Sequence, residues 1–312
     1  MAPPSAGWLR RPFADACLMS WGCPGAGGPA CQGPTAHLPG AWPPGMAGKA
    51  PGFSAQTRNG TGATSSCRHG GALLPDHGPV LVAGAGLGLG AALARRFAAA
   101  GHPVALGARS DAAISAVADE IAAAGGRALA LPYDVSDEEA VGGAIDRLEA
   151  ALGPVQILLY NAGNYVPGGV DQVRPEEFRA AWETGPWGAF LHARRLLPSM
   201  AQRREGAVLF TGATSSVYAP ARAPAFASAK FGLRGLAMSL MRQWGPQGVH
   251  VAHLLIDGAI LTPRAAREAG DAPDYLRPAD IAETYYQVAT QAPSSWSFEL
   301  DLRPFTDDYL EN

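Results

Sequence analysis

The segment from Pro79 to Gly90 constrains the fold more than any other part of the chain. It reads PVLVAGAGLGLG, a short apolar run followed by glycines at positions 84, 86, 88 and 90, and a run with helical character follows from Ala91. A buried strand, a glycine-rich turn and a helix N-terminus together form a pyrophosphate site, because backbone N–H groups and the helix dipole face the anion. An ordinary glycine-rich turn is the alternative, but the flanking strand and helix favour the nucleotide site.

After residue 78 the chain alternates short apolar runs with amphipathic helical runs. This alternation predicts an α/β fold with a doubly wound, parallel, seven-stranded sheet and helices on both faces. In such a sheet, ligands bind at the carboxyl ends of the strands. We expect strands at residues 80–82, 104–106, 128–131, 155–160, 207–210, 249–256 and 297–302, and helices at residues 91–98, 112–124, 137–152, 176–200, 226–244 and 278–290.

The first 76 residues differ in composition from the rest. They hold eleven of the 27 prolines, and Asp15 is their only acidic residue before Asp76. Without a hydrophobic period of 2 or 3.6, this segment does not bury enough surface to offset its ordering entropy. We therefore expect residues 1–76 to be disordered, or to reflect a start codon assigned too far upstream, and residues 77–312 to form one folded domain.

Charge and cysteine content exclude several classes of function. The net charge of −3 gives no electrostatic footprint for nucleic acid, and no apolar run reaches the roughly 18 residues of a membrane span. All four cysteines precede the first strand, so the folded part has no disulfide and no cysteine metal site. We expect a cytoplasmic protein that binds no metal, acts on a small molecule and has neither nucleic acid nor membrane as a partner.

Arg109 follows the second predicted strand, where a dinucleotide-binding fold meets the adenosine ribose. A carboxylate there would bind a free 2′-hydroxyl, whereas an arginine favours a 2′-phosphate. We therefore expect NADP, with NAD as the alternative. A solvated surface arginine is the competing interpretation, and Leu87 leaves the glycine turn without a basic residue to support NADP.

Two further motifs follow strand ends. Asp134-Val135 would place a carboxylate at the adenine edge. The alternative for Asp134 is to cap the next helix, but Ser136 suits that role better, because Glu139 stands three residues after it as in a capping box. The run 161–163, Asn-Ala-Gly, lets backbone lie flat against a cofactor, while the Asn161 amide joins adjacent loops. A simple turn is the alternative for this run.

Taken together, these motifs resemble the short-chain dehydrogenase/reductase family over about residues 78–302. The resemblance implies a Rossmann domain, usually in dimers or tetramers built on two long helices. It also implies that Asp257-Gly258-x-x-x-Thr262, with Asp257 where the family has proline, holds the nicotinamide carboxamide. The positions expected to contact the cofactor are Gly84, Gly86, Leu87, Gly88, Leu89, Arg109, Asp134, Val135, Asn161, Ala162, Gly163, Phe226, Lys230, Asp257, Gly258, Ile260 and Thr262.

The catalytic positions depart from the family pattern. Its Tyr-x-x-x-Lys pair reads Phe226 to Lys230, so the lysine is present and the phenol that would exchange a proton is not. Counting back thirteen residues from Phe226 for the family's serine reaches Ala213, which leaves Thr214 or Ser215 for that role. The helix asparagine reads Gly185, and the proline after it should kink the helix.

Tyr218 is the expected surrogate acid, by analogy with 2,4-dienoyl-CoA reductases, which also lack the usual tyrosine. An exposed loop aromatic is the alternative for Tyr218. The interpretation requires that no other phenol lies beside Phe226. The resulting hypothesis is an NADP-dependent oxidoreductase acting on a carbonyl/alcohol pair or an activated C=C bond; the alternative is an inactive NADP(H)-binding protein, either a redox sensor or an oligomer partner.

The remaining charged residues and histidines can also be explained by packing, ion pairs or solvent exposure, without a binding role. Residues 263–277, where the family has a substrate lid, carry Arg264, Arg267 and Tyr275 and suggest an anionic or acyl-CoA-like substrate, although solvated charges explain them equally well. His250 and His253 should point to opposite faces of a strand and pack rather than bind metal. Glu299, Asp301 and Arg303 favour an ion-pair rim on the last strand.

Overall fold

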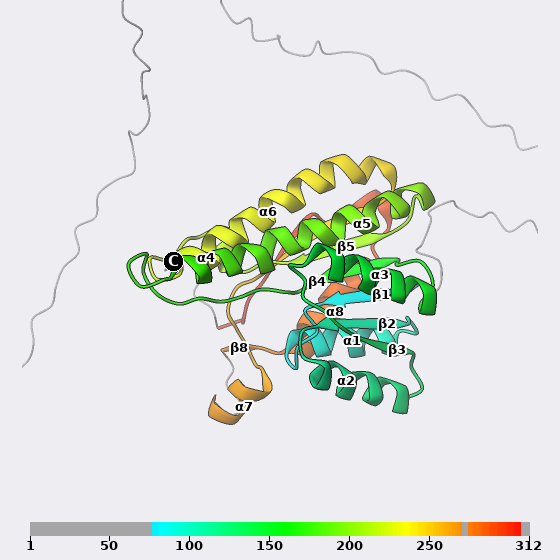
Figure 1. Ribbon diagram of the computed structural model, residues 1–312, viewed down its shortest axis with the longest axis horizontal. Helices are drawn as coiled ribbons and strands as arrows, with labels where there is room; N and C mark the ends of the chain where they lie inside the picture. The colour runs from blue at the N-terminus through cyan, green and yellow to red at the C-terminus, as the bar shows by residue number, and fades with distance from the viewer. Residues whose placement is uncertain (1–76, 270–273, 307–312) are drawn as a thin grey trace, which may run out of the picture. The chain divides into compact units, whose positions relative to one another are not determined.

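The computed structural model describes residues 77–269 and 274–306 (Figure 1). The expectation for residues 1–76 falls outside the described residues. Within them, seven parallel strands form the main sheet, in the order β3-β2-β1-β4-β5-β6-β9. The predicted doubly wound sheet is confirmed. The strands are β1 (Val80–Ala83), β2 (Val104–Ala108), β3 (Ala128–Pro132), β4 (Ile157–Tyr160), β5 (Ala207–Thr211), β6 (His250–Ile256) and β9 (Glu299–Leu302).

Helices cover both faces of this sheet (Figure 1). One face packs against α3, α5 and α6, and the opposite face packs against α1, α2 and α8. Every residue of β1 and β4 is buried, which is why these central strands read as unbroken apolar runs. The main helices are α1 (Leu89–Ala99), α2 (Asp111–Ala123), α3 (Glu138–Leu152), α4 (Pro175–Trp182), α5 (Gly188–Arg203), α6 (Pro224–Trp244) and α8 (Pro278–Ala289).

The strand order reverses between β1 and β4. β1 pairs in parallel with β2 on one side and with β4 on the other. Val80 of β1 is in register with Val104 of β2 and with Ile157 of β4. The connections from these two strands therefore leave toward opposite halves of the sheet, which opens a crevice at their carboxyl ends.

The long helical region around Pro186 is interrupted, as the sequence predicts. A π-helical turn, η1 (Glu183–Trp187), separates α4 from α5, and Gly185 has the non-helical angles φ −83° and ψ −106°. Proline lacks the N–H that a continuous helix needs, so the break occurs here. A Cβ built on Gly185 would lie 3.4 Å from the Cβ of Ala229, so this kink rests against α6.

Smaller elements complete the described chain. The predicted cap at Ser136 is wrong by one residue: Asp137 caps α3 by accepting from the N–H groups of Glu139 and Ala140.

Across the described ranges, no helix combines the length and apolarity needed to cross a bilayer. The smaller elements are η2 (Thr214–Ser216), η3 (Gly245–Gln247), β7 (Ala259–Ile260), α7 (Pro263–Ala269), β8 (Tyr275–Leu276) and η4 (Pro293–Ser295).

Candidate active site

The glycine turn after β1 requires glycine at two positions and leaves open space at a third. Gly84 has φ +92°, and a Cβ there would lie 2.5 Å from the backbone nitrogen of Ala162. A Cβ on Gly90 would lie 2.4 Å from the carbonyl oxygen of Gly84, whereas one on Gly86 meets nothing within 4 Å. α1 begins here with no side-chain cap and no acidic residue in its first turn, so no side chain competes with an anion for its first N–H groups, although that of Ala91 donates to the carbonyl oxygen of Gly86 (2.9 Å).

A series of side-chain hydrogen bonds holds this turn from behind. The Tyr285 hydroxyl donates to Thr211 Oγ1 (2.7 Å), which donates to Asn161 Oδ1 (3.1 Å). The Asn161 amide then donates to the carbonyl oxygen of Gly84 (2.9 Å). Asn161 thus joins the loops after β1 and β4, which is the contact expected from the sequence.

A cleft of about 310 Å³ opens at the carboxyl ends of β1, β2 and β4. Arg109 is exposed at the end of β2. Two hydrogen bonds from Ser136 lower the pKa of Asp134, and the charge of Arg109 lowers it further. Eight of the predicted cofactor positions line it: Gly84, Gly86, Arg109, Asp134, Val135, Asn161, Ala162 and Gly163.

The Asp134 loop is fixed by the residue before it. Tyr133 is buried, and its hydroxyl donates to His192 Nε2 on α5 (2.8 Å). His192 Nδ1 donates in turn to the carbonyl oxygen of Gly188 (2.7 Å). Burial lowers the pKa of His192 to about 4, so the ring is neutral and able to accept from Tyr133 at neutral pH.

Lys230 lies at the inner end of the site. It is 7% exposed, and its ammonium donates to the carbonyl oxygen of Thr211 (2.7 Å). Its Nζ lies 3.6 Å from a Cβ built on Gly163 and 5.5 Å from the centre of the Phe226 ring. Burial lowers the pKa of Lys230 to about 8, so the side chain is still mostly charged at pH 7, only about one pH unit below that pKa.

A phenol does lie beside Phe226, contrary to the expectation from the sequence. The Tyr165 ring meets the Phe226 ring edge to face, with 5.2 Å between centroids, and Tyr165 is 65% exposed. Tyr218, the expected surrogate, is 62% exposed on the turn after η2. Sequence reasoning missed Tyr165 because it belongs to the β4 loop, about sixty residues before Phe226; its place just after the Asn-Ala-Gly motif was the available signal.

Of the two residues expected in the serine role, Thr214 makes the informative contact. Ser215 is buried, whereas Thr214 is partly exposed and its hydroxyl donates to Asp257 Oδ1. Asp257 Oδ2 pairs with Arg303 Nη1 (2.7 Å), so Arg303 reaches the site and is more than part of a rim. No spacing rule in the sequence would join these three residues.

The segment after Asp257 returns to the glycine turn. Gly258 has φ +140°, Ile260 forms β7, and the Thr262 methyl group lies 3.2 Å from a Cβ built on Gly88. Leu89 is buried in the core, so of this residue only the backbone is open to a ligand. Leu87 is 58% exposed and lines a separate apolar hollow of about 540 Å³ between α1, α7 and α8.

The two strand histidines pack as expected. His250 stacks on Trp296 with 4.9 Å between centroids, and His253 Nδ1 lies 3.0 Å from Glu299 Oε2. Within the described ranges no three His, Cys, Asp or Glu side chains gather into a metal-binding group.

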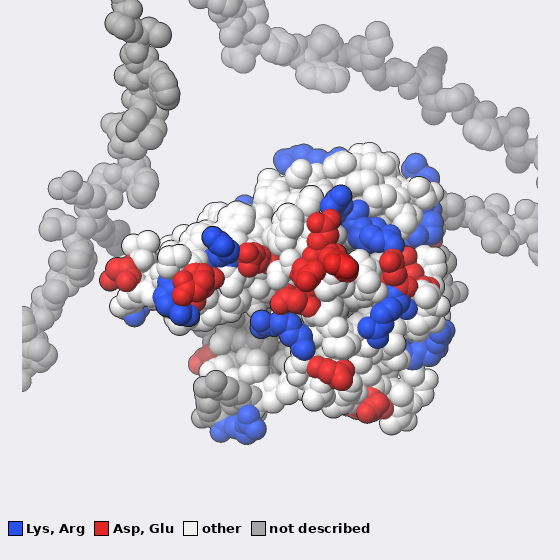
Figure 2. Space-filling model, in the orientation of Figure 1, with Lys and Arg blue, Asp and Glu red and all other residues white. Residues whose placement is uncertain are grey.

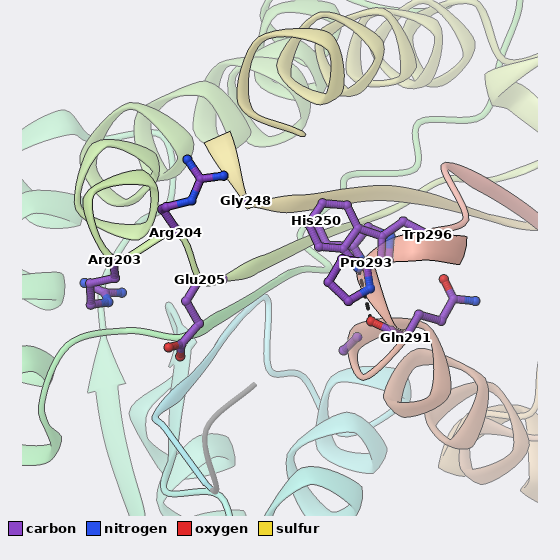
Figure 3. Close-up of a pocket in the computed structure, with 10 residues that line it drawn as sticks. Arg203, Arg204, Glu205, Gly248, His250, Gln291, Pro293 and Trp296 are labelled. Carbon is purple, nitrogen blue, oxygen red and sulfur yellow. Dashed lines mark hydrogen bonds between the residues drawn. The ribbon is translucent and has the colours of Figure 1, made fainter. Parts of the chain in front are cut away.

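Another cavity, of about 410 Å³, lies at the opposite edge of the sheet from the cleft (Figure 3). His250, Trp296 and Pro293 form one side, and Arg203 and Arg204 at the end of α5 form the other (Figure 3). His250 is the first residue of β6, so this cavity adjoins the amino ends of the strands. None of the predicted site residues lies there, and the cleft at the carboxyl ends is the candidate active site.

Comparison with known proteins agrees with this geometry. A family model described as short chain dehydrogenase matches residues 79–271. A short chain dehydrogenase of Pseudocercospora fijiensis (strain CIRAD86) is 34% identical over 173 residues, which is 54% of this chain and 55% of that protein. The chain therefore spans little more than half the length of that relative.

Two solved structures share the fold. A short-chain dehydrogenase from Rhodopseudomonas palustris is 35% identical, with a TM-score of 0.65 over 73% of this chain and 99% of that one. A metagenomic short-chain oxidoreductase in complex with NADP is 28% identical, with a TM-score of 0.65 over 73% of this chain and 97% of the other.

Proposed function

This chain belongs to the short-chain dehydrogenase family, and on that premise we propose that it is an NADP-dependent oxidoreductase. It would transfer hydride to or from a carbonyl/alcohol pair or an activated C=C bond. The observation that carries the proposal is the glycine turn, with open space at Gly86, facing a cleft that extends from Arg109 to Asn161 and Gly163. The solved relative that binds NADP supports the choice of cofactor.

The residues present fit NADP. The N–H groups of the glycine turn and of α1 would hold the diphosphate, and Arg109 the 2′-phosphate. Lys230 would donate to the ribose hydroxyls, and the segment ending at Thr262 would hold the carboxamide. The nicotinamide ring supplies or accepts the hydride, and the chain's own side chains must exchange the proton.

Phe226 has no proton to exchange, so we infer that another group does so. The hydroxyl of Thr214 and the phenols of Tyr165 and Tyr218 are the candidates in the described part of the site. Removing a positioned acid or base typically costs about 10²–10⁴-fold in rate, which sets the size of effect to look for among them.

Titration with NADPH and NADH, followed by the fluorescence of the bound nicotinamide, tests the cofactor. We expect NADPH to bind more tightly than NADH, and Arg109→Ala to weaken NADPH about 10- to 100-fold with little effect on NADH, because a hydrogen-bonded charge pair contributes about 1.5–3 kcal/mol. Absence of binding for both nucleotides would refute the proposal. Binding without turnover on alcohols, ketones and enones would favour the inactive alternative.

We further propose a homodimer or homotetramer. Phe178 and Trp182 of α4, Phe190 of α5 and Phe231 of α6 are each about 40% exposed. On the face that Figure 2 shows, charges of both signs are interspersed, with a broad uncharged area over α6. Light scattering after size exclusion should give a multiple of 32.2 kDa, and Phe231→Asp should reduce it; a wild-type monomer would refute this.

A further inference from the structure

Asp257, at the carboxyl edge of the sheet, accepts from two side chains, one on each carboxylate oxygen. The Thr214 hydroxyl donates to Asp257 Oδ1, and Arg303 Nη1 holds the other carboxylate oxygen at 2.7 Å. A hydroxyl has one proton and two lone pairs. Since the proton of Thr214 is committed to Asp257, its oxygen offers a ligand lone pairs only.

This pair lies at the end of the site where the reacting carbon is expected. Thr214 follows β5, and Asp257 follows the adjacent strand β6. The segment that starts at Asp257 returns to the glycine turn, because Thr262 lies against Gly88. Thr214 is partly exposed to solvent.

Arg303 matters because it pairs with the acceptor carboxylate. The side chain of Asp257 is 13% exposed and that of Arg303 is 20% exposed, so the pair is shielded from much of the solvent. Placing a carboxylate where little solvent reaches it is costly unless a cation and hydrogen bonds compensate. Asp257 has both, from Arg303 and from Thr214.

We propose that Thr214 and Asp257 together accept the hydroxyl proton of an alcohol substrate, which deepens the proposed function and rests on it. The substrate C–H bond would break with its electron pair leaving as hydride, which a bound oxidised nicotinamide would accept. The alcohol proton passes to Thr214 Oγ1 while the proton of that oxygen passes to Asp257, and the C=O bond forms. Asp257 then returns the proton to water. Thr214 is the catalytic residue here, and Asp257 and Arg303 are positioning residues that act through it.

The test compares oxidation of a panel of secondary alcohols by NADP across matched variants. We expect Thr214→Val to lower kcat about 10²–10⁴-fold with the Kd for NADPH unchanged, Asp257→Asn to lower kcat by a similar factor, and Thr214→Ser to retain most of the rate. Asp301→Asn is the matched control, because Asp301 also pairs with Arg303 (2.8 Å), whereas the carboxylate that accepts from Thr214 is that of Asp257. It should leave kcat unchanged.

A binding measurement gives a second readout that needs no turnover. In the complex with NADPH, an alcohol should bind the wild type about 3- to 10-fold more tightly than its methyl ether, because only the alcohol donates to Thr214. Thr214→Val should abolish that preference. This variant leaves the Asp257–Arg303 pair intact, so it stays informative if Asp257→Asn does not fold.

The outcomes separate the two proposals. Failure of the wild type to bind NADPH would refute the proposed function. Binding and turnover in the wild type, with kcat of Thr214→Val within twofold of it, would overturn the pair and leave the function standing. Loss of turnover in Tyr165→Phe or Tyr218→Phe, but not in Thr214→Val, would likewise overturn the pair and assign the proton to that phenol.

Discussion

Replacing Lys230 with methionine should change the stability of the protein in a way that reverses with pH. Lys230 is buried, and its pKa falls from 10.5 to about 8. The unfolded chain therefore binds a proton at this residue between about pH 8 and 10.5, whereas the folded protein does not. By linkage, the wild-type free energy of unfolding rises with pH across that window.

The size of the effect follows from the two pKa values. Burying this side chain costs about 3 kcal/mol at pH 7, where the folded protein holds the charge, and about 1 kcal/mol at pH 10, where it releases a proton that the unfolded chain still binds. Methionine removes this cost, but it also removes the hydrogen bond to the Thr211 carbonyl, which contributes about 1–2 kcal/mol. Lys230→Met should therefore be more stable than the wild type at pH 7 and less stable at pH 10.

Urea unfolding of both proteins between pH 7 and 10 measures the difference, and other titrating groups cancel in it. The chain has only two lysines, Lys49 and Lys230. Carbon-13 labelling of lysine thus gives a direct NMR titration, in which the signal lost in Lys230→Met should have a midpoint near pH 8. A difference in stability that stays constant from pH 7 to 10, with an NMR midpoint above 10, would refute the reasoning.

Three further predictions concern other parts of the site. Phe226→Tyr places a phenol near the Lys230 ammonium and should raise the rate of carbonyl reduction at least about tenfold; an unchanged rate in the folded variant would show that the missing phenol is not limiting. Gly84→Ala should cost more than about 2 kcal/mol in urea unfolding because of its positive φ and a blocked Cβ, while Gly143→Ala, in open space on α3, should stabilise by about 0.5–1 kcal/mol. Because the pKa of buried His192 is about 4, wild-type stability should fall as the pH drops from about 6.5 toward 4, by about 2 kcal/mol at pH 5 for this residue, and His192→Gln should flatten that fall.

The sheet and the cofactor end of the site were predictable because their signals are local. The central strands β1, β4, β5 and β6 are buried throughout and read as largely apolar runs, and each motif follows a strand directly. Parallel strands bring their carboxyl ends to one edge, so Arg109, Asp134 and Asn161 meet there whatever the intervening helices contain. The break at Pro186 was equally local, since it follows from the missing N–H.

The contacts at the reacting end could not be read from the chain. Tyr165 meets Phe226 only because the β4 loop crosses the start of α6, and Arg303 meets Asp257 only because β9 pairs with β6. No periodicity encodes such pairs, since they depend on how loops of different lengths pack. The choice of Asp137 over Ser136 as cap shows the same limit over one residue, because both have suitable side chains.

The hydrogen-bonded series from Tyr285 through Thr211 and Asn161 to Gly84 makes α8 a distant support of the nucleotide loop. Substitutions on this helix, far in sequence from any recognised motif, should alter how well the loop is shaped before a ligand arrives. Tyr285→Phe removes one oxygen and should loosen Asn161 without touching the cleft. Efforts to vary the cofactor of this scaffold would therefore gain from treating α8 and the glycine turn as one unit, to be changed together.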